Sequence, residues 1–99
     1  MGAFDLVVEI YTVQALHGSL REDAVSGVRR LVAPGGTFFV VQIVRDDEEE
    51  VGAEPPWLLD RAEMAALAGD GLVAESLDRL PNFDRPEARD RWRMVLTRR

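Results

Sequence analysis

The stretch FDLVVEIYTVQAL, residues 4–16, contains the feature that decides the fold. Its first seven residues, 4–10, are almost continuously apolar, and only Asp5 and Glu9 interrupt them. Continuous rather than alternating apolarity is typical of a strand covered on both faces, as in a parallel sheet. A loop of polar and aromatic residues follows at once. We therefore expect a buried strand in an α/β fold, with a polar loop at its carboxyl end.

A helix and a second strand should follow this loop. The segment Ser19-Leu20-Arg21-Glu22 fits a capping box, with Ser as the N-cap and Glu three residues later. Apolar residues then recur at helical spacing as far as Val32, and Pro34-Gly35-Gly36 predicts a turn that ends the helix. Residues 37–44 form a second nearly continuous apolar run. Two such runs joined by one helix predict adjacent parallel strands in a βαβ unit.

The rest of the chain predicts a loop, a second helix and two further strands. Residues 45–56 form an acidic loop closed by two prolines, which reads most simply as a solvated connector. Asp60 and Glu63 are spaced as another capping box. Residues 72–80 should form a half-exposed strand. Residues 91–98 alternate apolar and polar side chains, which marks a strand with one face in water, as in antiparallel pairing.

Composition limits the classes of protein that the chain can represent. Its 99 residues suffice for one domain, which we expect to span residues 1–99. The net charge of −6 disfavours a nucleic-acid partner, because phosphate contacts need a basic surface. No apolar run is long enough to cross a membrane, and no signal peptide is visible. The absence of cysteine fits a cytoplasmic location.

The order of the predicted elements, together with the sequence segments quoted below, resembles the C-terminal half of a class I S-adenosylmethionine-dependent methyltransferase. The nearest types are small bacterial enzymes of the thiopurine or tellurite-resistance kind. FDLVVEIYTVQAL resembles the family's fourth strand and loop, and REDAVSGVRRLVAPGGTFFVV, residues 21–41, its next helix and fifth strand. PPWLLDRAEMAALAGDGLVAESL, residues 55–77, resembles the following helix and sixth strand, and RWRMVLTRR, residues 91–99, the antiparallel seventh.

This resemblance implies a partial Rossmann-like sheet that lacks the half with the glycine-rich cofactor loop. Gly35 and Gly36 precede a strand, whereas that loop follows one. The implied function is methyl transfer from S-adenosylmethionine to a small-molecule acceptor, by a chain that is part of a longer or truncated methyltransferase. The chain of 99 residues is not expected to be active alone. The alternative is a non-catalytic remnant that serves as a binding or dimerisation module, pairing as a homodimer through the edge of strand Phe4–Ile10.

The resemblance also indicates which residues line the cofactor or the substrate, although it assigns no catalytic residue. These residues, at the carboxyl edge of the first strand, are Glu9, Ile10, Tyr11, Thr12 and Gln14. The other interpretation, equally open, is that Tyr11 and Gln14 only cap the strand and pack on the next helix.

Three other features invite a functional interpretation. Trp57, behind two prolines, is either a substrate lid or, more simply, an anchor between its loop and the core. His17, the one histidine, fits an exposed turn better than a catalytic role. The carboxylates of residues 46–50 are consecutive and splay apart, so we expect no metal site there.

Overall fold

The computed structural model describes residues 4–82, 85 and 87–99 of the chain. The elements are, in order, β1 (Phe4–Ile10), a 3-10 turn η1 (Val13–Ala15), α1 (Gly18–Arg29), β2 (Val32–Ile43), α2 (Arg61–Ala65), β3 (Leu72–Leu80) and β4 (Arg91–Arg98). All four predicted strands are therefore present.

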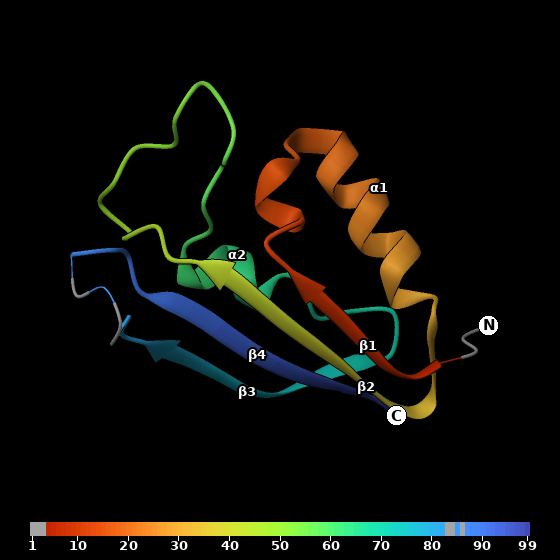
Figure 1. Cartoon of the computed structure of the whole chain (residues 1–99). Coiled ribbons are helices and arrows are strands. Elements are labelled where there is room, and N and C mark those ends of the chain that lie inside the picture. Colours follow the sequence, from red (N-terminus) through yellow and green to blue (C-terminus); the bar gives the residue numbers. More distant parts are fainter. Residues whose placement is uncertain (1–3, 83–84, 86) are drawn as a thin grey trace.

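The strands form one mixed sheet in the order β1-β2-β4-β3 (Figure 1). β1 pairs parallel with β2, and β4 pairs antiparallel with both β2 and β3. The predicted parallel pair joined by a helix is confirmed, as is the antiparallel last strand. The result is the α/β, partial Rossmann-like sheet that the sequence predicts.

One face of this sheet is covered, and it holds the core. Alternate residues of β2 and β4 point to the same side as the buried residues of both helices. These core residues include Val25 on α1, Phe38 and Val40 on β2, Met64 on α2, and Trp92, Met94 and Leu96 on β4. The alternation predicted for residues 91–98 is thus confirmed.

The opposite face of the sheet is open, and this corrects one expectation. β1 was predicted to be buried on both faces, but the structure exposes most of it, including about half or more of Leu6, Val8 and Ile10. The physical reason is its place at the edge of a sheet that carries helices on one side only (Figure 1). The second apolar run, 37–44, is likewise only half-buried on its open side.

The Pro34-Gly35-Gly36 turn lies inside β2 as an irregularity of the parallel pairing. Phe4 is opposite Val32 and Leu6 is opposite Thr37, so the extra β2 residues bulge out between these pairs. Gly35 has a φ of 77°, which favours glycine. A Cβ on Gly36 would lie 2.8 Å from the Ala33 carbonyl oxygen and 3.1 Å from that of Phe4. Glycine at position 36 therefore lets β1 and β2 approach.

The helix boundaries agree only in part with those predicted from the sequence. α1 begins at Gly18, and its N-cap His17 makes no side-chain capping bond, so the Ser19–Glu22 capping box is wrong. The start of α1 is fixed instead by Arg21, which reaches back to carbonyls of the preceding loop. α1 also ends before Val32, which already belongs to β2.

The second capping box is confirmed, and the acidic segment lies between β2 and α2. Asp60 accepts a hydrogen bond from the Glu63 amide and Glu63 bonds back to the Asp60 amide, at the start of the short helix α2. Residues 45–56 form no helix or strand and extend away from the sheet (Figure 1). No described helix is long and apolar enough to cross a membrane.

Candidate functional site

The loop between β1 and α1 is held in place by a buried polar trio. Glu9 at the end of β1 accepts the Thr12 amide at 2.9 Å through Oε1, and its Oε2 accepts the side-chain amide of Gln42. The Gln42 Oε1 accepts the backbone N–H of Gln14 at 3.2 Å. Gln14 Oε1 in turn accepts the Ile43 N–H at 2.9 Å. The side chains of Glu9 and Gln14 thus tie the loop to the carboxyl end of β2.

This arrangement divides the five candidate site residues into two groups. Glu9 and Gln14 are buried, and both carboxylate oxygens of Glu9 and the side-chain oxygen of Gln14 accept hydrogen bonds within the protein. Ile10, Tyr11 and Thr12 lie between them and are exposed. The structure therefore brings the five together on one loop, with two residues that support it and three that it presents to solvent.

Tyr11 is the most constrained residue of this loop. Its φ is 63°, in the left-handed region that non-glycine residues seldom adopt. Its N–H donates to the Val41 carbonyl at 3.0 Å, which extends the β1–β2 ladder by one bond. A backbone held in such a region is kept there by its surroundings, and such residues cluster at functional sites. Here the surroundings are the bonds of Glu9 and Gln14 on either side.

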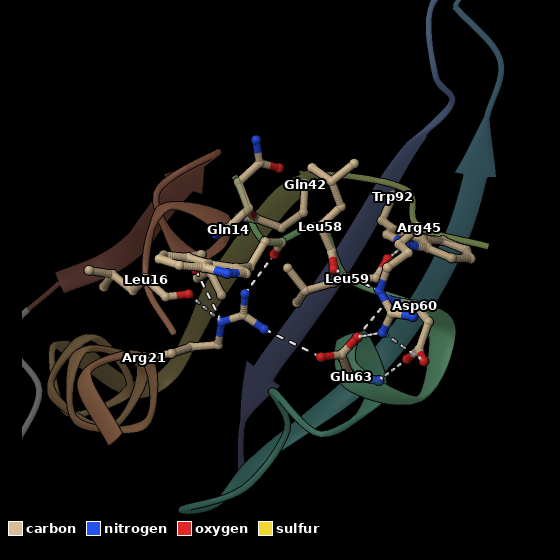
Figure 2. A network of polar contacts seen from close by, with 12 residues as sticks. Gln14, Leu16, Arg21, Gln42, Arg45, Leu58, Leu59, Asp60, Glu63 and Trp92 are labelled. Atoms are coloured by element: carbon tan, nitrogen blue, oxygen red, sulfur yellow. Dashed lines mark hydrogen bonds and ion pairs between the residues drawn. The ribbon is translucent and has the colours of Figure 1, made fainter. Parts of the chain in front are cut away.

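Arg21 joins the same loop to α2 (Figure 2). Its Nε donates to the carbonyls of Val13 at 3.2 Å and Leu16 at 3.0 Å. Its Nη2 donates to the Trp57 carbonyl at 2.6 Å, and its Nη1 lies 3.4 Å from Glu63 Oε2. Burial lowers the pKa of Arg21 because it penalises the charged guanidinium, and the charge of Glu63 partly offsets this.

A second arginine, Arg45, continues this network on the far side of Glu63 (Figure 2). It donates to the Leu58 carbonyl at 3.1 Å, to Asp60 at 3.2 Å and to Glu63 Oε1. Burial lowers the pKa of Arg45, but the hydrogen bonds and charges of Glu63 and Asp60 outweigh burial and raise it on balance. Glu63 is therefore the shared anion between two arginines and the cap of α2.

Trp57 lies beside the candidate loop rather than apart from it. Its backbone N–H donates to the Gln14 carbonyl at 2.6 Å, and its carbonyl accepts Arg21. Its indole stacks on the ring of His17, with centroids 5.0 Å apart and planes at 25°. Trp57 is half-buried and His17 is exposed. These contacts anchor the segment that follows the acidic connector to the start of α1, and the role of Trp57 as a lid stays a prediction.

The acidic connector makes ion pairs with two arginines, one near the end of β3 and one just before the start of β4. Arg79 lies 2.8 Å from Asp46, and Arg89 pairs with Glu49. The hydrogen bonds from Arg89 lower the pKa of Glu49 to about 2. Among the described residues no group of three or more potential ligands is placed to hold a metal ion.

Two hollows border the candidate loop. The first, of about 200 Å³, lies between β1 and α1, and its lining includes Val8, Ile10, Thr12, Leu16, Ala24 and Val28. The second, of about 340 Å³, lies between α1 and α2, and its lining includes His17, Arg21, Arg29, Glu63 and Leu67. The lining of the first hollow is mostly apolar.

Sequence reasoning found Glu9 and Gln14 but not Gln42 and Arg21, which also hold this loop in place. Gln42 sits in an apolar run as an isolated polar residue, which is a usable signal, because a buried amide needs partners. Arg21 reads as an ordinary solvent-facing residue on the polar side of α1. Its partners Trp57 and Glu63 are 36 and 42 residues away, so no local pattern reveals them.

Three solved structures that this chain resembles are methyltransferases, whereas neither a protein-family model nor a curated protein matches the sequence. One is the 1,6-didemethyltoxoflavin-N1-methyltransferase of Burkholderia thailandensis, solved with 1,6-didemethyltoxoflavin and S-adenosylhomocysteine. Its TM-score is 0.76 at 18% identity, over 96% of this chain and 44% of that one. A SAM-dependent methyltransferase from Methanosarcina mazei has a TM-score of 0.70 at 12% identity, over 96% and 59%. An O-methyltransferase family protein from Burkholderia thailandensis has 0.65 at 16%, over 99% and 31%.

These similarities establish the fold of the chain. Nearly all of it superposes on part of each methyltransferase, and it spans about half the length of the first two structures. The resemblance to the S-adenosylmethionine-dependent methyltransferase fold is confirmed at this level. The narrower thiopurine or tellurite-resistance type stays a prediction.

Proposed function

We propose that this chain carries one wall of the cofactor site of an S-adenosylmethionine-dependent methyltransferase that acts on a small molecule in the cytoplasm. The observation that supports this most is the match of nearly the whole chain to methyltransferase structures, one of which holds S-adenosylhomocysteine and 1,6-didemethyltoxoflavin. The cytoplasmic location rests on the absence of cysteine alone. Because the chain spans only part of those structures, the activity belongs to a more complete protein that contains this part.

The place of the proposed site follows from the topology of the sheet. In open α/β sheets, ligands bind outside the carboxyl ends of parallel strands. β1 and β2 are the parallel pair, and the loop fixed by Glu9, Gln42 and Gln14 lies at their carboxyl ends. Ile10, Tyr11 and Thr12 are the exposed residues there. The proposal therefore keeps these three as lining residues and treats Glu9 and Gln14 as positioning residues.

The residues present fit one side of the cofactor and not its whole surface. Small-molecule sites usually occupy roughly 300–1,000 Å³ and bury most of the ligand. The hollow beside Ile10 and Thr12 measures only about 200 Å³. Among the described residues, Gly35 and Gly36 lie in the β2 bulge and do not form a glycine-rich loop after a strand. The loop can thus contact the cofactor but cannot enclose it.

Bound S-adenosylmethionine supplies an electrophilic methyl group, and this chain would supply orientation. Methyl transfer depends chiefly on holding the acceptor in line, and correct positioning alone lowers a barrier substantially. The Tyr11 hydroxyl can donate to or accept from an acceptor, and Thr12 offers a second hydroxyl. Ile10 offers an apolar surface. The fixed backbone of Tyr11 keeps these groups in place without reorganisation on binding.

The proposal is tested by titrating the isotope-labelled chain with S-adenosylhomocysteine and following backbone amides by NMR. We expect a dissociation constant at or above about 1 mM. The changes should be confined to residues 10–16. Tyr11→Ala should weaken them further, whereas Val73→Ala on the far strand β3 should not.

Two results would contradict the proposal. Absence of any change at residues 10–16 with about 10 mM ligand would remove the cofactor from this loop, since a millimolar site would then be largely occupied. Micromolar affinity of the chain by itself would show that it encloses the cofactor, so that the one-wall interpretation is wrong.

A further inference from the structure

The hollow of about 340 Å³ between α1 and α2 is bounded at both ends by arginines of α1. Arg21, Val25 and Arg29 are spaced four residues apart, so they lie along one face of the helix over about 12 Å. At one end Arg21 pairs with Glu63 of α2 at 3.4 Å (Figure 2). At the other end Arg29 donates to the Leu67 carbonyl at 2.8 Å, just after α2. None of the described lining lies on β1, so the hollow is formed between the two helices.

The floor of this hollow is apolar and its rim carries an aromatic ring. Val25, Leu59 and Leu67 line it, and all three are buried. The exposed His17 also lines it, and its ring stacks on the indole of Trp57. Small-molecule sites are mostly apolar hollows of roughly 300–1,000 Å³ with a few well-placed polar groups. The hollow reaches this size, and its floor and rim fit a ligand with a flat apolar ring.

The charges that line the hollow cancel. The charged residues of its described lining are two arginines, Arg21 and Arg29, and two glutamates, Glu22 and Glu63. Glu63 is already paired with Arg21, and Arg29 is paired with Asp70 at 3.4 Å. Glu22 is exposed, so water and salt screen its charge. A charged ligand would lose its hydration here without gaining a free partner of opposite sign, which favours an uncharged ligand.

The two arginines keep N–H groups that have no acceptor. A guanidinium carries five N–H groups, two of them on each Nη. Arg21 uses one on Nη1 for Glu63 and one on Nη2 for the Trp57 carbonyl. The second N–H on each Nη therefore has no acceptor among the described residues. Arg29 Nη1 likewise makes one described bond, to Asp70. A carbonyl oxygen of a ligand can accept from these N–H groups.

We propose that the hollow between α1 and α2 binds a small, uncharged aromatic compound that carries a carbonyl group. The ring lies on the apolar floor beside His17, and the carbonyl oxygen accepts a hydrogen bond from Arg21. This site is separate from the proposed cofactor site and does not depend on it. It lies directly behind the candidate loop, because Arg21 also donates to the Leu16 carbonyl at 3.0 Å.

The experiment is a titration of the isotope-labelled 99-residue chain with benzamide, in which NMR follows the backbone amides. Benzamide is an uncharged ring with one carbonyl group. We expect saturable changes at the lining of the hollow, with a dissociation constant on the order of 1–10 mM, because so small a molecule makes few contacts. Benzoate keeps the ring with a negative charge, and benzylamine keeps it with a positive charge and no carbonyl. Each should bind at least about fivefold more weakly than benzamide.

Two adjacent alanines at the C-terminal end of α2 provide matched variants. Ala65 and Ala66 are both exposed, but only Ala66 belongs to the described lining. Ala66→Trp should fill the hollow and abolish the binding of benzamide, whereas Ala65→Trp should leave its dissociation constant unchanged. His17→Ala removes the ring at the rim and should weaken binding by about two- to tenfold. Circular dichroism establishes that each variant is folded.

Several results would overturn the proposal. Absence of any change with about 50 mM benzamide would exclude a site of this affinity. Changes centred on the exposed side chains of β1, or equal binding by Ala65→Trp and Ala66→Trp, would place benzamide outside the hollow. Unchanged binding by His17→Ala would remove the ring from the rim. Equal or tighter binding of benzoate or benzylamine would contradict an uncharged ligand. The titration with S-adenosylhomocysteine reports on residues 10–16, so the two proposals fail separately.

Discussion

Replacing Gln42 by Leu should destabilise the fold far more than a change of one polar residue usually does. The Gln42 side chain is fully buried and makes two hydrogen bonds, to the Glu9 carboxylate and to the Gln14 N–H. Leu has a similar volume, so the substitution leaves little cavity but removes both partners. Each buried group left without a partner costs about 1–3 kcal/mol, and more if it is charged.

The expected loss is therefore about 3–5 kcal/mol in the free energy of unfolding. A chain of 99 residues has a total stability of about 5–15 kcal/mol. Urea denaturation followed by circular dichroism should show a lower midpoint with an unchanged slope. The control is Arg93→Gln, which breaks an exposed ion pair with Asp78 at 3.2 Å and should cost less than about 1 kcal/mol.

A double variant distinguishes the interaction between Gln42 and Glu9 from the other effects of substituting Gln42. Adding Glu9→Leu to Gln42→Leu removes the unpaired carboxylate, so the double variant should be less destabilised than the sum of the two single variants. A loss below about 1 kcal/mol in Gln42→Leu would refute the reasoning. Strict additivity of the two substitutions would refute it as well, because the side chains would then not interact.

The remaining predictions concern the two arginine contacts that hold loops to the sheet. Arg21→Lys should cost about 1–3 kcal/mol, because Lys lacks the planar fork that reaches several acceptors at once, whereas the exposed Arg30→Lys should cost little. Urea denaturation gives the free energy of unfolding of both variants. Equal losses would show that the hydrogen bonds of Arg21 contribute no more to stability than those of the exposed Arg30. The pKa of Glu49 is lowered to about 2 by Arg89, so its contribution to stability is complete above pH about 4.5 and is lost as the pH falls to about 2. NMR titration of Glu49 should show the pKa rising toward its ordinary value in Arg89→Gln, and an unchanged midpoint would exclude this contact in solution.

The strands could be predicted because each depends on local pattern. The alternation in residues 91–98 places Trp92, Met94 and Leu96 in the core, as the structure confirms. The capping box at Asp60 and Glu63 is equally local, since both partners lie within four residues. Where residues distant in the sequence determine the end of an element, the local pattern gives a wrong prediction. The start of α1 is fixed by Arg21 and its partners, so the Ser19 capping box does not form.

The sequence predicts where the candidate loop lies in the fold, but not which of its side chains are buried and which are exposed. By the general rule for α/β sheets, ligands bind outside the carboxyl ends of parallel strands, and the sequence places residues 9–14 at such an end. Which side chains of that loop turn inward depends on Gln42, which is 28 residues from Gln14 and 33 from Glu9. Such a pairing across the sheet needs the register of β1 and β2. The sequence alone gives no means of separating Glu9 and Gln14 from the exposed residues between them.

The exposure of β1 bears on the proposed function. The side chains on one face of this strand, those of Phe4, Leu6, Val8 and Ile10, are all apolar, yet the structure places the strand at the edge of the sheet with these side chains exposed. An additional strand beside β1 would remove this conflict by pairing the outward N–H and C=O groups of Leu6, Val8 and Ile10, which alternate with the N–H that Tyr11 donates to Val41. A more complete methyltransferase sheet, as the proposed function requires, would offer such a strand. In a protein that fills this edge from within its own chain, the backbone amides of Leu6, Val8 and Ile10 should therefore be protected from hydrogen exchange.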